Sequence, residues 1–278
     1  MLPNRSFPWL GLVVGNTRLH WALFSGDALQ GTWHTRHLHQ AEVDNLIAHQ
    51  FRAKAWTSLG TLALPQWLDT LGAALSDKGP IALCVASVVP AQLAVWQGYP
   101  GLQVLTLEQV PLTSVYPTMG IDRALNLLGA GDRYGWPVLV IDAGTALTFT
   151  AGDAGQFLGG AILPGLTLQF KALPAHTAQL PQVKVASTLP PRWAQTTAEA
   201  MQSGIVYSAI ATLQDFLADW YRQYPQATAV LTGGDGPHFL NWLQTEKRPK
   251  YTLHWDANLM FWGLYRCYQR LQRSLKDH

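Results

Sequence analysis

The stretch Val138–Gly165, VLVIDAGTALTFTAGDAGQFLGGAILPG, carries the pattern that decides the fold. A β-branched run ends in Asp142, the chain turns at Gly144, and an alternating run follows over residues 146–150. Glycine between two such runs predicts a strand, a tight turn and a second strand. The acid, the glycine and the hydroxyl of Thr145 then gather where a phosphate could approach the backbone closely. Taken alone, the stretch leaves an ordinary hairpin with a solvated turn equally open.

The same pattern occurs near the N-terminus. Residues 10–24 contain an apolar run, a Gly-Asn-Thr turn and an alternating run. Alignment of Gly15 with Gly144 places Val13 opposite Asp142, so the first copy lacks the acid. One strand-turn-strand unit therefore opens each half of the chain, and two such units facing each other could point both turns at one polyphosphate.

Composition narrows the class of protein. The chain has 278 residues, enough for one large or two ordinary domains. Charged residues make up 13% of the chain, against about 25% in a typical soluble domain. The 12 Trp indicate either a surface buried against a partner chain or a large aromatic core. The net charge is +2, and the most basic stretch, residues 246–250, is short, which argues against nucleic-acid binding.

Cysteine content and hydropathy exclude further classes. The 2 cysteines show no CxxC spacing, so neither a zinc motif nor a disulfide framework is expected. No apolar run approaches the roughly 18 residues that a membrane helix needs. The N-terminal residues lack the apolar region and cleavage site of a signal peptide. We therefore expect a cytoplasmic protein with no membrane contact.

The two halves share an order of expected elements. In the first half we expect strands over residues 9–14, 18–24, 28–35, 81–89 and 102–106, and helices over 41–52, 65–76 and 90–96. After a helix over 121–134, the second half has expected strands over 138–142, 146–150, 156–162 and 227–231, and helices from 196, from 237 and over 257–275. Thr196-Thr197-Ala198-Glu199 reads as a capping box. The β-β-β-α-β-α-β order resembles part of a ribonuclease-H-like fold.

Polar clusters interrupt this apolar plan. The amides and hydroxyl of Gly15-Asn16-Thr17, with His20 close by, could hold terminal phosphates, although Asn and Gly are also ordinary hairpin residues. The glycines of Thr232-Gly233-Gly234-Asp235-Gly236 would let an adenine or ribose lie on the backbone, or simply allow a flexible turn. We interpret His34, His37 and His39 as surface residues.

A further cluster, Gly120-Ile121-Asp122-Arg123, opens a helix. A carboxylate in the first helical turn is stabilised by the dipole and the exposed backbone N–H groups, and it can accept the proton of an attacking hydroxyl. The adjacent arginine can neutralise phosphate or bind a carboxylate through two hydrogen bonds. The alternative is an ordinary acidic helix start beside a solvated arginine.

The order of these clusters resembles that of the type III pantothenate kinases. A Gly-Asn-Thr turn, Gly-x-Asp-Arg, Asp-Ala-Gly-Thr-Ala, Phe-Leu-Gly-Gly with Pro-Gly, a Thr-Thr pair and Thr-Gly-Gly-Asp follow one another along nearly the whole chain. That family belongs to the acetate/sugar kinase, heat-shock-70 and actin superfamily. The resemblance implies an α/β fold of two ribonuclease-H-like (actin-like ATPase) domains, each a mixed β-sheet flanked by helices, with the active site in the cleft between them. We place the domains at residues 1–118 and 119–278, with a homodimer interface in the second.

The resemblance also implies an activity and a set of site residues. The activity is ATP-dependent phosphorylation of pantothenate to 4′-phosphopantothenate, the first step of coenzyme A biosynthesis, with Mg²⁺ or another divalent cation. Asp122 would be the general base, and Asp142 would bind K⁺ or NH₄⁺. Pantothenate contacts are implied for Tyr116, Gly120, Ile121, Asp122, Arg123 and Thr197. ATP contacts are implied for Gly15, Asn16, Thr17, His20, Thr145, Gly233 and Gly234.

Two positions depart from the family's pattern. The family's first motif is Asp-x-Gly-Asn-Thr, whose Asp helps to hold Mg²⁺-ATP, and that position is Val13 here. The lysine that usually follows is His20. Because Asp122, Arg123 and Asp142 all remain, we expect an active kinase. Val13 favours the alternative of a weak or inactive member that binds nucleotide or pantothenate as a regulatory protein. A third reading is a kinase of the same superfamily that acts on a sugar or small acid.

Overall fold

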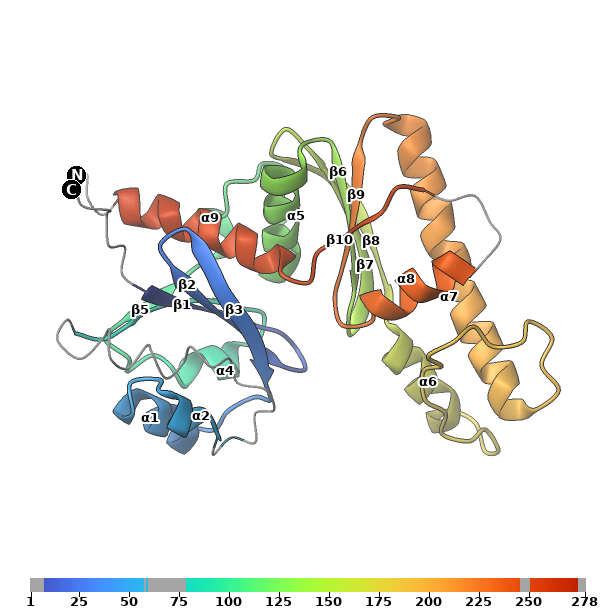
Figure 1. Ribbon diagram of the computed structural model, residues 1–278, viewed down its shortest axis with the longest axis horizontal. Coiled ribbons are helices and arrows are strands. Elements are labelled where there is room, and N and C mark those ends of the chain that lie inside the picture. Colours follow the sequence, from blue (N-terminus) through green and yellow to red (C-terminus); the bar gives the residue numbers. More distant parts are fainter. Residues whose placement is uncertain (1–7, 58, 60–78, 246–250, 275–278) are drawn as a thin grey trace. The chain divides into compact units, whose positions relative to one another are not determined.

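The structure, a computed structural model, describes residues 8–57, 59, 79–245 and 251–274. The helix expected over residues 65–76 and the basic stretch 246–250 lie outside the described residues. Within them the chain forms two five-stranded sheets (Figure 1). The first sheet contains β1 (Pro8–Val14), β2 (Leu19–Ser25), β3 (Ala28–Thr35), β4 (Ala82–Ser87) and β5 (Leu102–Val104). The second contains β6 (Val138–Ala143), β7 (Ala146–Asp153), β8 (Gln156–Pro164), β9 (Thr228–Thr232) and β10 (His254–Trp255).

The two sheets have the same topology. Their strand orders are β3-β2-β1-β4-β5 and β8-β7-β6-β9-β10 when the second is read from β8. In each, the first three strands of the sequence are antiparallel, and the last two lie parallel to the first. The predicted repeat is therefore confirmed, because β1-β2 and β6-β7 occupy the same two positions. Two mixed sheets flanked by helices also confirm the expected fold class.

One face of the first sheet carries an aromatic core. Alternate residues of β1 point Leu10, Leu12 and Val14 to one side, where α1 (Gln40–Ala48), α2 (Ala53–Thr57) and α4 (Pro90–Ala94) contribute to the cover. Trp21 lies at the centre of this core, 4.9 Å from Trp56 and 5.4 Å from Trp96 between ring centroids. Several tryptophans therefore lie in the core, which favours a large aromatic core as the explanation of the high tryptophan content.

The opposite face of β1 receives the C-terminal helix α9 (Leu259–Ser274). A Cβ atom on Gly11 would lie only 2.8 Å from Leu264, so a glycine is needed for the helix to approach. Trp9 stacks on Tyr268 with 3.9 Å between ring centroids. The helix comes from the far end of the chain, yet it completes the core of the first sheet.

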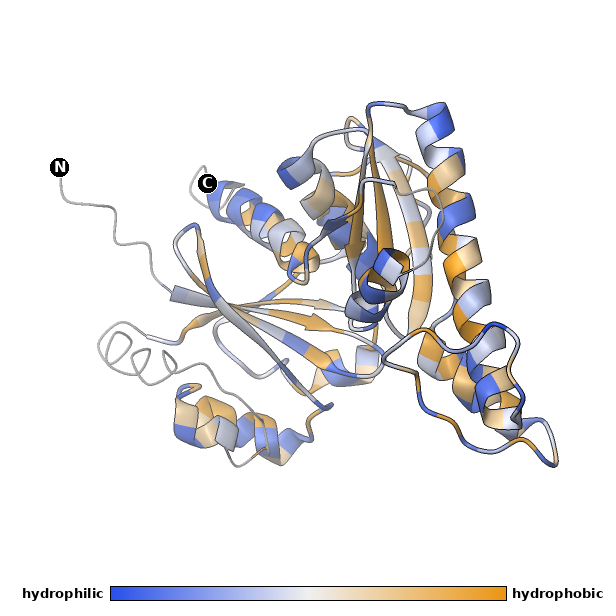
Figure 2. Cartoon of the chain, turned by 45° about the vertical axis from the view of Figure 1, so that its right-hand side comes forward, coloured by the Kyte–Doolittle hydropathy of each residue, from blue (hydrophilic) through white to orange (hydrophobic). Residues whose placement is uncertain are grey.

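The second sheet packs against α6 (Leu166–Ala175), α7 (Thr197–Gln223) and α8 (Gly236–Thr245). Leu213 and Phe149 are buried between α7 and the sheet, and Figure 2 shows apolar and polar residues alternating along this long helix. The N-cap half of the predicted capping box is present: the Thr196 hydroxyl accepts a hydrogen bond from the Glu199 amide at 3.3 Å. The Glu199 carboxylate accepts from the Thr196 hydroxyl at 2.9 Å, and not from the Thr196 backbone amide as a capping box requires. No helix among the described residues combines the length and the apolar character needed to cross a membrane.

The chain divides into two compact units that do not follow a single boundary. The first unit comprises residues 1–111, 116–129 and 260–278, and the second comprises residues 112–115 and 130–259. Compared with the expected boundary between residues 118 and 119, the start of α5 (Ile121–Tyr134) and all but the first residue of α9 fall in the first unit. The physical reason is packing: Gly263 of α9 lies against the backbone of Leu125 in α5.

Candidate active site

The first group of predicted site residues surrounds the turn between β1 and β2. The Gly15 amide closes this turn on the Arg18 carbonyl at 3.0 Å, and Asn16 and Thr17 are exposed at its tip. His37 donates a hydrogen bond from Nε2 to the Gly15 carbonyl at 2.8 Å. Hydrogen bonds to the amide and the carbonyl of Gly15 thus hold the base of the turn, and its tip is exposed to solvent.

The two departures from the family's pattern face each other across this hairpin. Val13 pairs with His20 in the antiparallel register of β1 and β2, so both side chains lie on the same face. Val13 is only 1% exposed. The acid and the lysine of the family's motif would therefore be cross-strand neighbours, and here an apolar and an uncharged side chain stand in their places. Val13 and His20 together thus replace a pair of opposite charges by two uncharged side chains.

His20 itself contacts a residue that the sequence interpretation assigned to the surface. His20 Nδ1 lies 3.0 Å from His34 Nδ1 on β3. Burial, then His34, then Arg18 lower the pKa of His20 to about 4. Partial burial and Arg18 lower the pKa of His34 as well. At neutral pH both rings are therefore uncharged in this environment.

The second group lies at the start of α5. The Asp122 carboxylate accepts a hydrogen bond from the Arg123 amide at 2.8 Å. A Cβ atom on Gly120 would lie 2.5 Å from Asp122 Oδ1, so glycine leaves the space that the carboxylate occupies. Burial raises the pKa of Asp122, which makes its carboxylate a stronger base than a solvated aspartate. Arg123 is buried, and its guanidinium donates to the Tyr116 hydroxyl at 2.7 Å. The structure thus brings Tyr116 to this group.

These two groups are connected within the first unit. The Val88 amide donates to the Val14 carbonyl at 3.1 Å, at the point where β1 ends. The Val88 side chain also lies 3.9 Å from the Cβ position of Gly120. The Gly15 turn and the start of α5 therefore lie at the same edge of the first sheet.

The third group is centred on Asp142 in the second unit. Asp142 stands at the end of β6, with Thr148 of β7 and Thr232 of β9 opposite it in register. The three side chains therefore share one face of the sheet. The Thr232 hydroxyl is buried and has no hydrogen-bond partner among the described residues. A buried oxygen of this kind beside a carboxylate fits a cation that prefers oxygen ligands.

Glycines pack closely around the turn that follows Asp142. A Cβ atom on Gly233, whose φ is +91°, would clash with Asp142 Oδ1. A Cβ atom on Gly165 would clash with the Gly144 carbonyl. The Asp235 amide donates to the Ala143 carbonyl at 2.8 Å. Three motifs that lie far apart in the sequence thus meet at this turn, and Thr145 is exposed at its tip.

The remaining predicted residues occupy simpler positions. Thr197 is the first residue of α7 and is exposed, and Ile121 is buried at the first position of α5. Gly234 is exposed beside Gly233. The sequence interpretation missed His34, His37 and the hydroxyls of Thr148 and Thr232. Strand register identifies Thr148 and Thr232. It does not identify His34, which a β-bulge brings opposite His20, and no signal in the sequence identifies His37.

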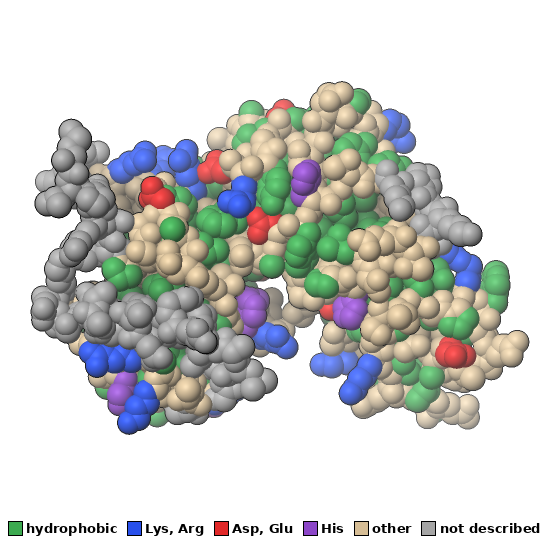
Figure 3. All heavy atoms as spheres, in the orientation of Figure 1, with side chains coloured by type: hydrophobic (Ala, Val, Ile, Leu, Met, Phe, Trp, Pro, Cys, Tyr) green, Lys and Arg blue, Asp and Glu red, His purple; other side chains and the backbone are tan. Residues whose placement is uncertain are grey.

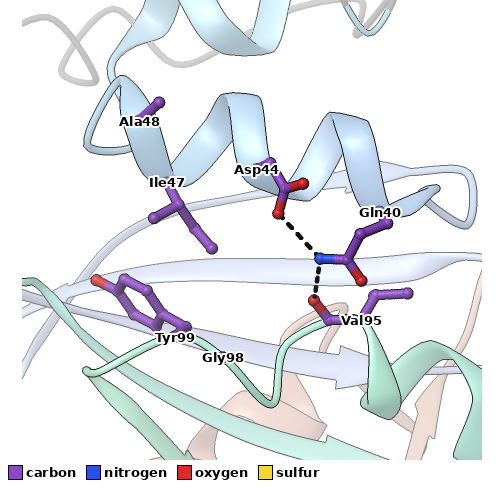
Figure 4. A pocket seen from close by; sticks show the side chains of 7 residues that line it. All are labelled: Gln40, Asp44, Ile47, Ala48, Val95, Gly98 and Tyr99. Carbon is purple, nitrogen blue, oxygen red and sulfur yellow. Dashed lines mark hydrogen bonds between the residues drawn. The ribbon is translucent and has the colours of Figure 1, made fainter.

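Two cavities of the first unit are lined by residues other than those predicted for the site. One of about 280 Å³ lies between α1 and the segment after α4, and there the Gln40 amide donates to Asp44 at 2.9 Å and to the Val95 carbonyl at 3.2 Å (Figure 4). Another of about 170 Å³ lies on α9, where Figure 3 shows basic side chains gathered; it is lined by Pro111, Arg266, Gln269, Arg270 and Arg273.

Comparison with known proteins agrees with the fold and the order of motifs. The family model for type III pantothenate kinases matches residues 9–219. The type III pantothenate kinase of a Nostoc species is 45% identical over 260 residues, spanning 92% of each chain. That of a Synechocystis species is 42% identical over 264 residues, spanning 94% of this chain and 90% of the relative.

Solved structures show the same fold at low identity. A Baf family protein from Campylobacter jejuni has a TM-score of 0.58 and 16% identity, covering 95% of this chain and 99% of that one. An activator of 2-hydroxyisocaproyl-CoA dehydratase from Clostridium difficile, with bound ADPNP, has a TM-score of 0.50 and 10% identity, covering 98% of each chain.

Two sheets of one topology, each with a glycine turn after its first strand, define the actin-like ATPase class of folds. Within that class, the family match is specific and covers most of the chain. The chain belongs to the type III pantothenate kinase family.

Proposed function

We propose that this protein transfers the γ-phosphate of ATP to the primary hydroxyl of pantothenate, giving 4′-phosphopantothenate, the first intermediate toward coenzyme A. Membership of the kinase family supports this reaction. The observation that supports the assignment of particular residues is made at the start of α5. There the carboxylate of Asp122, whose pKa is raised by burial, lies beside the buried Arg123. A kinase acting on an alcohol needs such a base and such a charge.

In this mechanism Asp122 accepts the proton of the pantothenate hydroxyl as it attacks the phosphorus atom. Arg123, held by Tyr116, neutralises charge on the transferred phosphoryl group or on the pantothenate carboxylate. Gly120 and Ile121 supply backbone around the substrate, and Thr197 is a further pantothenate contact. Phosphoryl transfer depends mainly on positioning and charge neutralisation, so these residues need little further chemistry.

The nucleotide contacts that we propose are Gly15, Asn16, Thr17 and His20 in the first unit, and Thr145, Gly233 and Gly234 in the second. The kinase uses ATP with a divalent cation. The described residues contain no group of three His, Cys, Asp or Glu side chains that would hold a metal ion by themselves. We propose that phosphate oxygens and water supply most ligands of the divalent ion, as Mg²⁺ commonly accepts. Asp142, with the Thr232 hydroxyl beside it, suits K⁺ or NH₄⁺.

A coupled assay of the full chain with pantothenate, ATP, Mg²⁺ and K⁺ tests the reaction. We expect turnover with pantothenate, and none with sugars or small hydroxy acids. If the protein binds nucleotide and pantothenate but shows no turnover at millimolar ATP, the regulatory alternative replaces the kinase. Turnover of another alcohol in place of pantothenate would favour a different kinase of the superfamily. The relatives reported above are named as kinases, so they give the regulatory alternative no support.

We also propose a homodimer built on the second unit. β8 alternates between half-buried and exposed residues, and its exposed face includes Leu158 and Ile162, the latter 63% exposed. Leu168 of α6 is exposed as well. Apolar side chains of this size on one edge strand and the next helix suit a second copy of the chain. We expected the interface in the second domain, and β8 and α6 are the elements that we propose for it.

The dimer is expected to show twice the 30.6 kDa mass of one chain in light scattering at micromolar concentration. Ile162→Asp should shift the mass to that of a monomer, because the charge would be buried without a partner. Val104→Asp, at an exposed apolar position of the first sheet, is the matched control and should stay dimeric. A monomeric wild type would contradict both the interface and the assignment of Thr197.

Restoring the family's acid should destabilise the protein unless its partner is restored too. Val13→Asp places a carboxylate at a buried position opposite a neutral imidazole, which costs several kcal/mol at pH 8. Adding His20→Lys supplies the missing cation, so the double variant should melt higher than Val13→Asp alone. Thermal melts of the wild type, both single variants and the double variant measure this coupling. Additive effects of the two substitutions would show that the positions do not interact.

A further inference from the structure

The contact between His20 and His34 restricts the protons that the two rings can carry. The two Nδ1 atoms are 3.0 Å apart, and the rings meet edge to face with an interplanar angle of 76°. One Nδ1 must donate and the other must accept, because two N–H groups cannot face each other at this distance. The contact therefore forms in the neutral pair and in the singly protonated pair, and it breaks when both rings are protonated.

The surroundings of the pair oppose a charge while no anion is present. β1 faces His20 with Val13, which is apolar, and Ala86 of β4 lies on the far side of Val13. Arg18 adds a positive charge that lowers the pKa of both rings. On β3, Arg36 lies two residues beyond His34, and it forms an ion pair with Glu42 of α1 at 2.5 Å.

The pair is placed at the turn proposed for phosphate. Nε2 of His20 lies 3.3 Å from the Cβ position of Gly15, on the side of the ring opposite His34. His37 holds the carbonyl of that same glycine. A proton added to His20 therefore places an N–H group at the turn, while Nδ1–H of His20 is accepted by Nδ1 of His34.

We propose that the His20–His34 pair takes up one proton from solvent when a polyphosphate binds at the turn formed by Gly15, Asn16 and Thr17, and that the imidazolium so formed binds the phosphate. The inference rests on the proposed function for the presence of the nucleotide at this turn. His34 is a positioning residue: its Nδ1 accepts the hydrogen bond of the protonated His20 ring and fixes the direction in which Nε2–H points.

This arrangement accounts for the joint loss of the acid and the lysine from the family's motif. A lysine carries a permanent charge, which requires an acid beside it when no nucleotide is bound. A histidine pair next to valine stays neutral and gains its charge only when phosphate supplies the counter-charge. The site therefore needs no carboxylate at position 13, and nucleotide affinity becomes dependent on pH.

Isothermal titration calorimetry of the full chain with the Mg²⁺ complex of AMP-PNP tests the proposal. The titration is run at pH 8, in buffers that differ in ionisation enthalpy. We expect the binding enthalpy to change with the buffer in the sense of proton uptake, approaching one proton per chain. By linkage, the Kd should rise by up to about tenfold per pH unit above pH 7.5. Binding with the same enthalpy in every buffer would overturn the proposal.

Variants separate the pair from other sources of protons. His20→Gln should bind more weakly and without proton uptake, whereas His20→Lys should bind without uptake because its charge is already present. His34→Phe should lower the uptake, since the protonated His20 loses its acceptor. His176→Gln, at an exposed histidine after α6, is the control and should keep the full uptake. Undiminished uptake in His20→Gln would assign the proton elsewhere and overturn the proposal.

The experiment also distinguishes this inference from the proposed kinase function. If the protein phosphorylates pantothenate and binds AMP-PNP without taking up a proton, only the histidine proposal fails. If it neither binds AMP-PNP nor turns over, the nucleotide site and the histidine proposal fail together.

Discussion

Asp122→Asn is expected to lower kcat by ~10²–10⁴-fold, the usual contribution of a general base. The amide keeps the shape of the side chain, and its oxygen can still accept the hydrogen bond from the Arg123 amide. It cannot accept the proton of the pantothenate hydroxyl. Because burial disfavours the carboxylate at this position, the neutral amide should fold at least as well as the wild type. Steady-state kinetics and a thermal melt at the same pH measure both effects.

The control for this substitution lies on the same helix. Asp132→Asn makes the same chemical change at an exposed position of α5 and should leave kcat within a factor of two of wild type. In the wild type, kcat/KM should fall as the pH falls through the raised pKa of Asp122, because the protonated carboxyl is no longer a base. An Asp122→Asn enzyme that works within a few-fold of wild type would show that another group takes the proton.

Asp142→Ala is expected to remove most activity together with the response to potassium. The carboxylate is the anionic ligand of the proposed cation site, and the Thr232 hydroxyl alone would not hold K⁺. Without the carboxylate, the positive charge of the bound K⁺ is lost from the phosphate site. This loss should lower kcat/KM for ATP by on the order of 10²-fold. Assays across a range of KCl concentrations, with the ionic strength held constant by a tetraalkylammonium salt, measure it. Full activity with full potassium stimulation would contradict the assignment.

Two further variants separate the cation from the fold. Asp153→Ala removes a carboxylate at the other end of β7 and should keep both activity and potassium stimulation. Thr232→Val replaces a buried hydroxyl that has no partner among the described residues with a methyl group of the same shape. It should raise or preserve the melting temperature, because an unsatisfied buried hydroxyl is unfavourable. If the hydroxyl is a cation ligand, the potassium concentration for half-maximal activity should rise at the same time.

Local patterns in the sequence predict the sheets well. Each half begins with an apolar run, a glycine turn and an alternating run, and these features set strand identity and register directly. Strand β3 and helix α5 lie where they were expected, and α7 begins directly after its predicted N-cap, Thr196. In contrast, the helix expected over residues 41–52 ends at Ala48, because Gln50 and Phe51 adopt positive φ, which no sequence signal there indicates.

Other elements depend on tertiary contacts and were missed. Helix α6, which contains Pro174 near its end, has no counterpart among the elements expected from the sequence. The two-residue strand β10 exists only because it pairs with β9. The division of the chain into units was expected at one boundary, but the packing of α9 on the first sheet is a contact between sequence ends that periodicity does not contain.

The histidine pair shows how a single irregularity hides part of a site. Counting back from the turn at Gly26 and Asp27 pairs Phe24 with Leu29, as the structure has it. The same count would pair His20 with Trp33 and place His34 on the other face of the sheet. A bulge between Leu23 and Phe24 shifts the register by one residue, so that His20 lies opposite His34. Nothing in the sequence marks that bulge.

The position of α9 has a consequence for how the protein is made. The face of β1 that contains Trp9 and Gly11 is covered by α9, which leaves the ribosome after every other described element. Until α9 has been synthesised, one apolar face of the N-terminal sheet is exposed to solvent. Exposed apolar surface of this kind makes nascent chains prone to misassociate or to bind chaperones. The first unit can therefore reach its native state only after α9 has been synthesised, whereas residues 130–259 of the second unit are synthesised before the rest of α9.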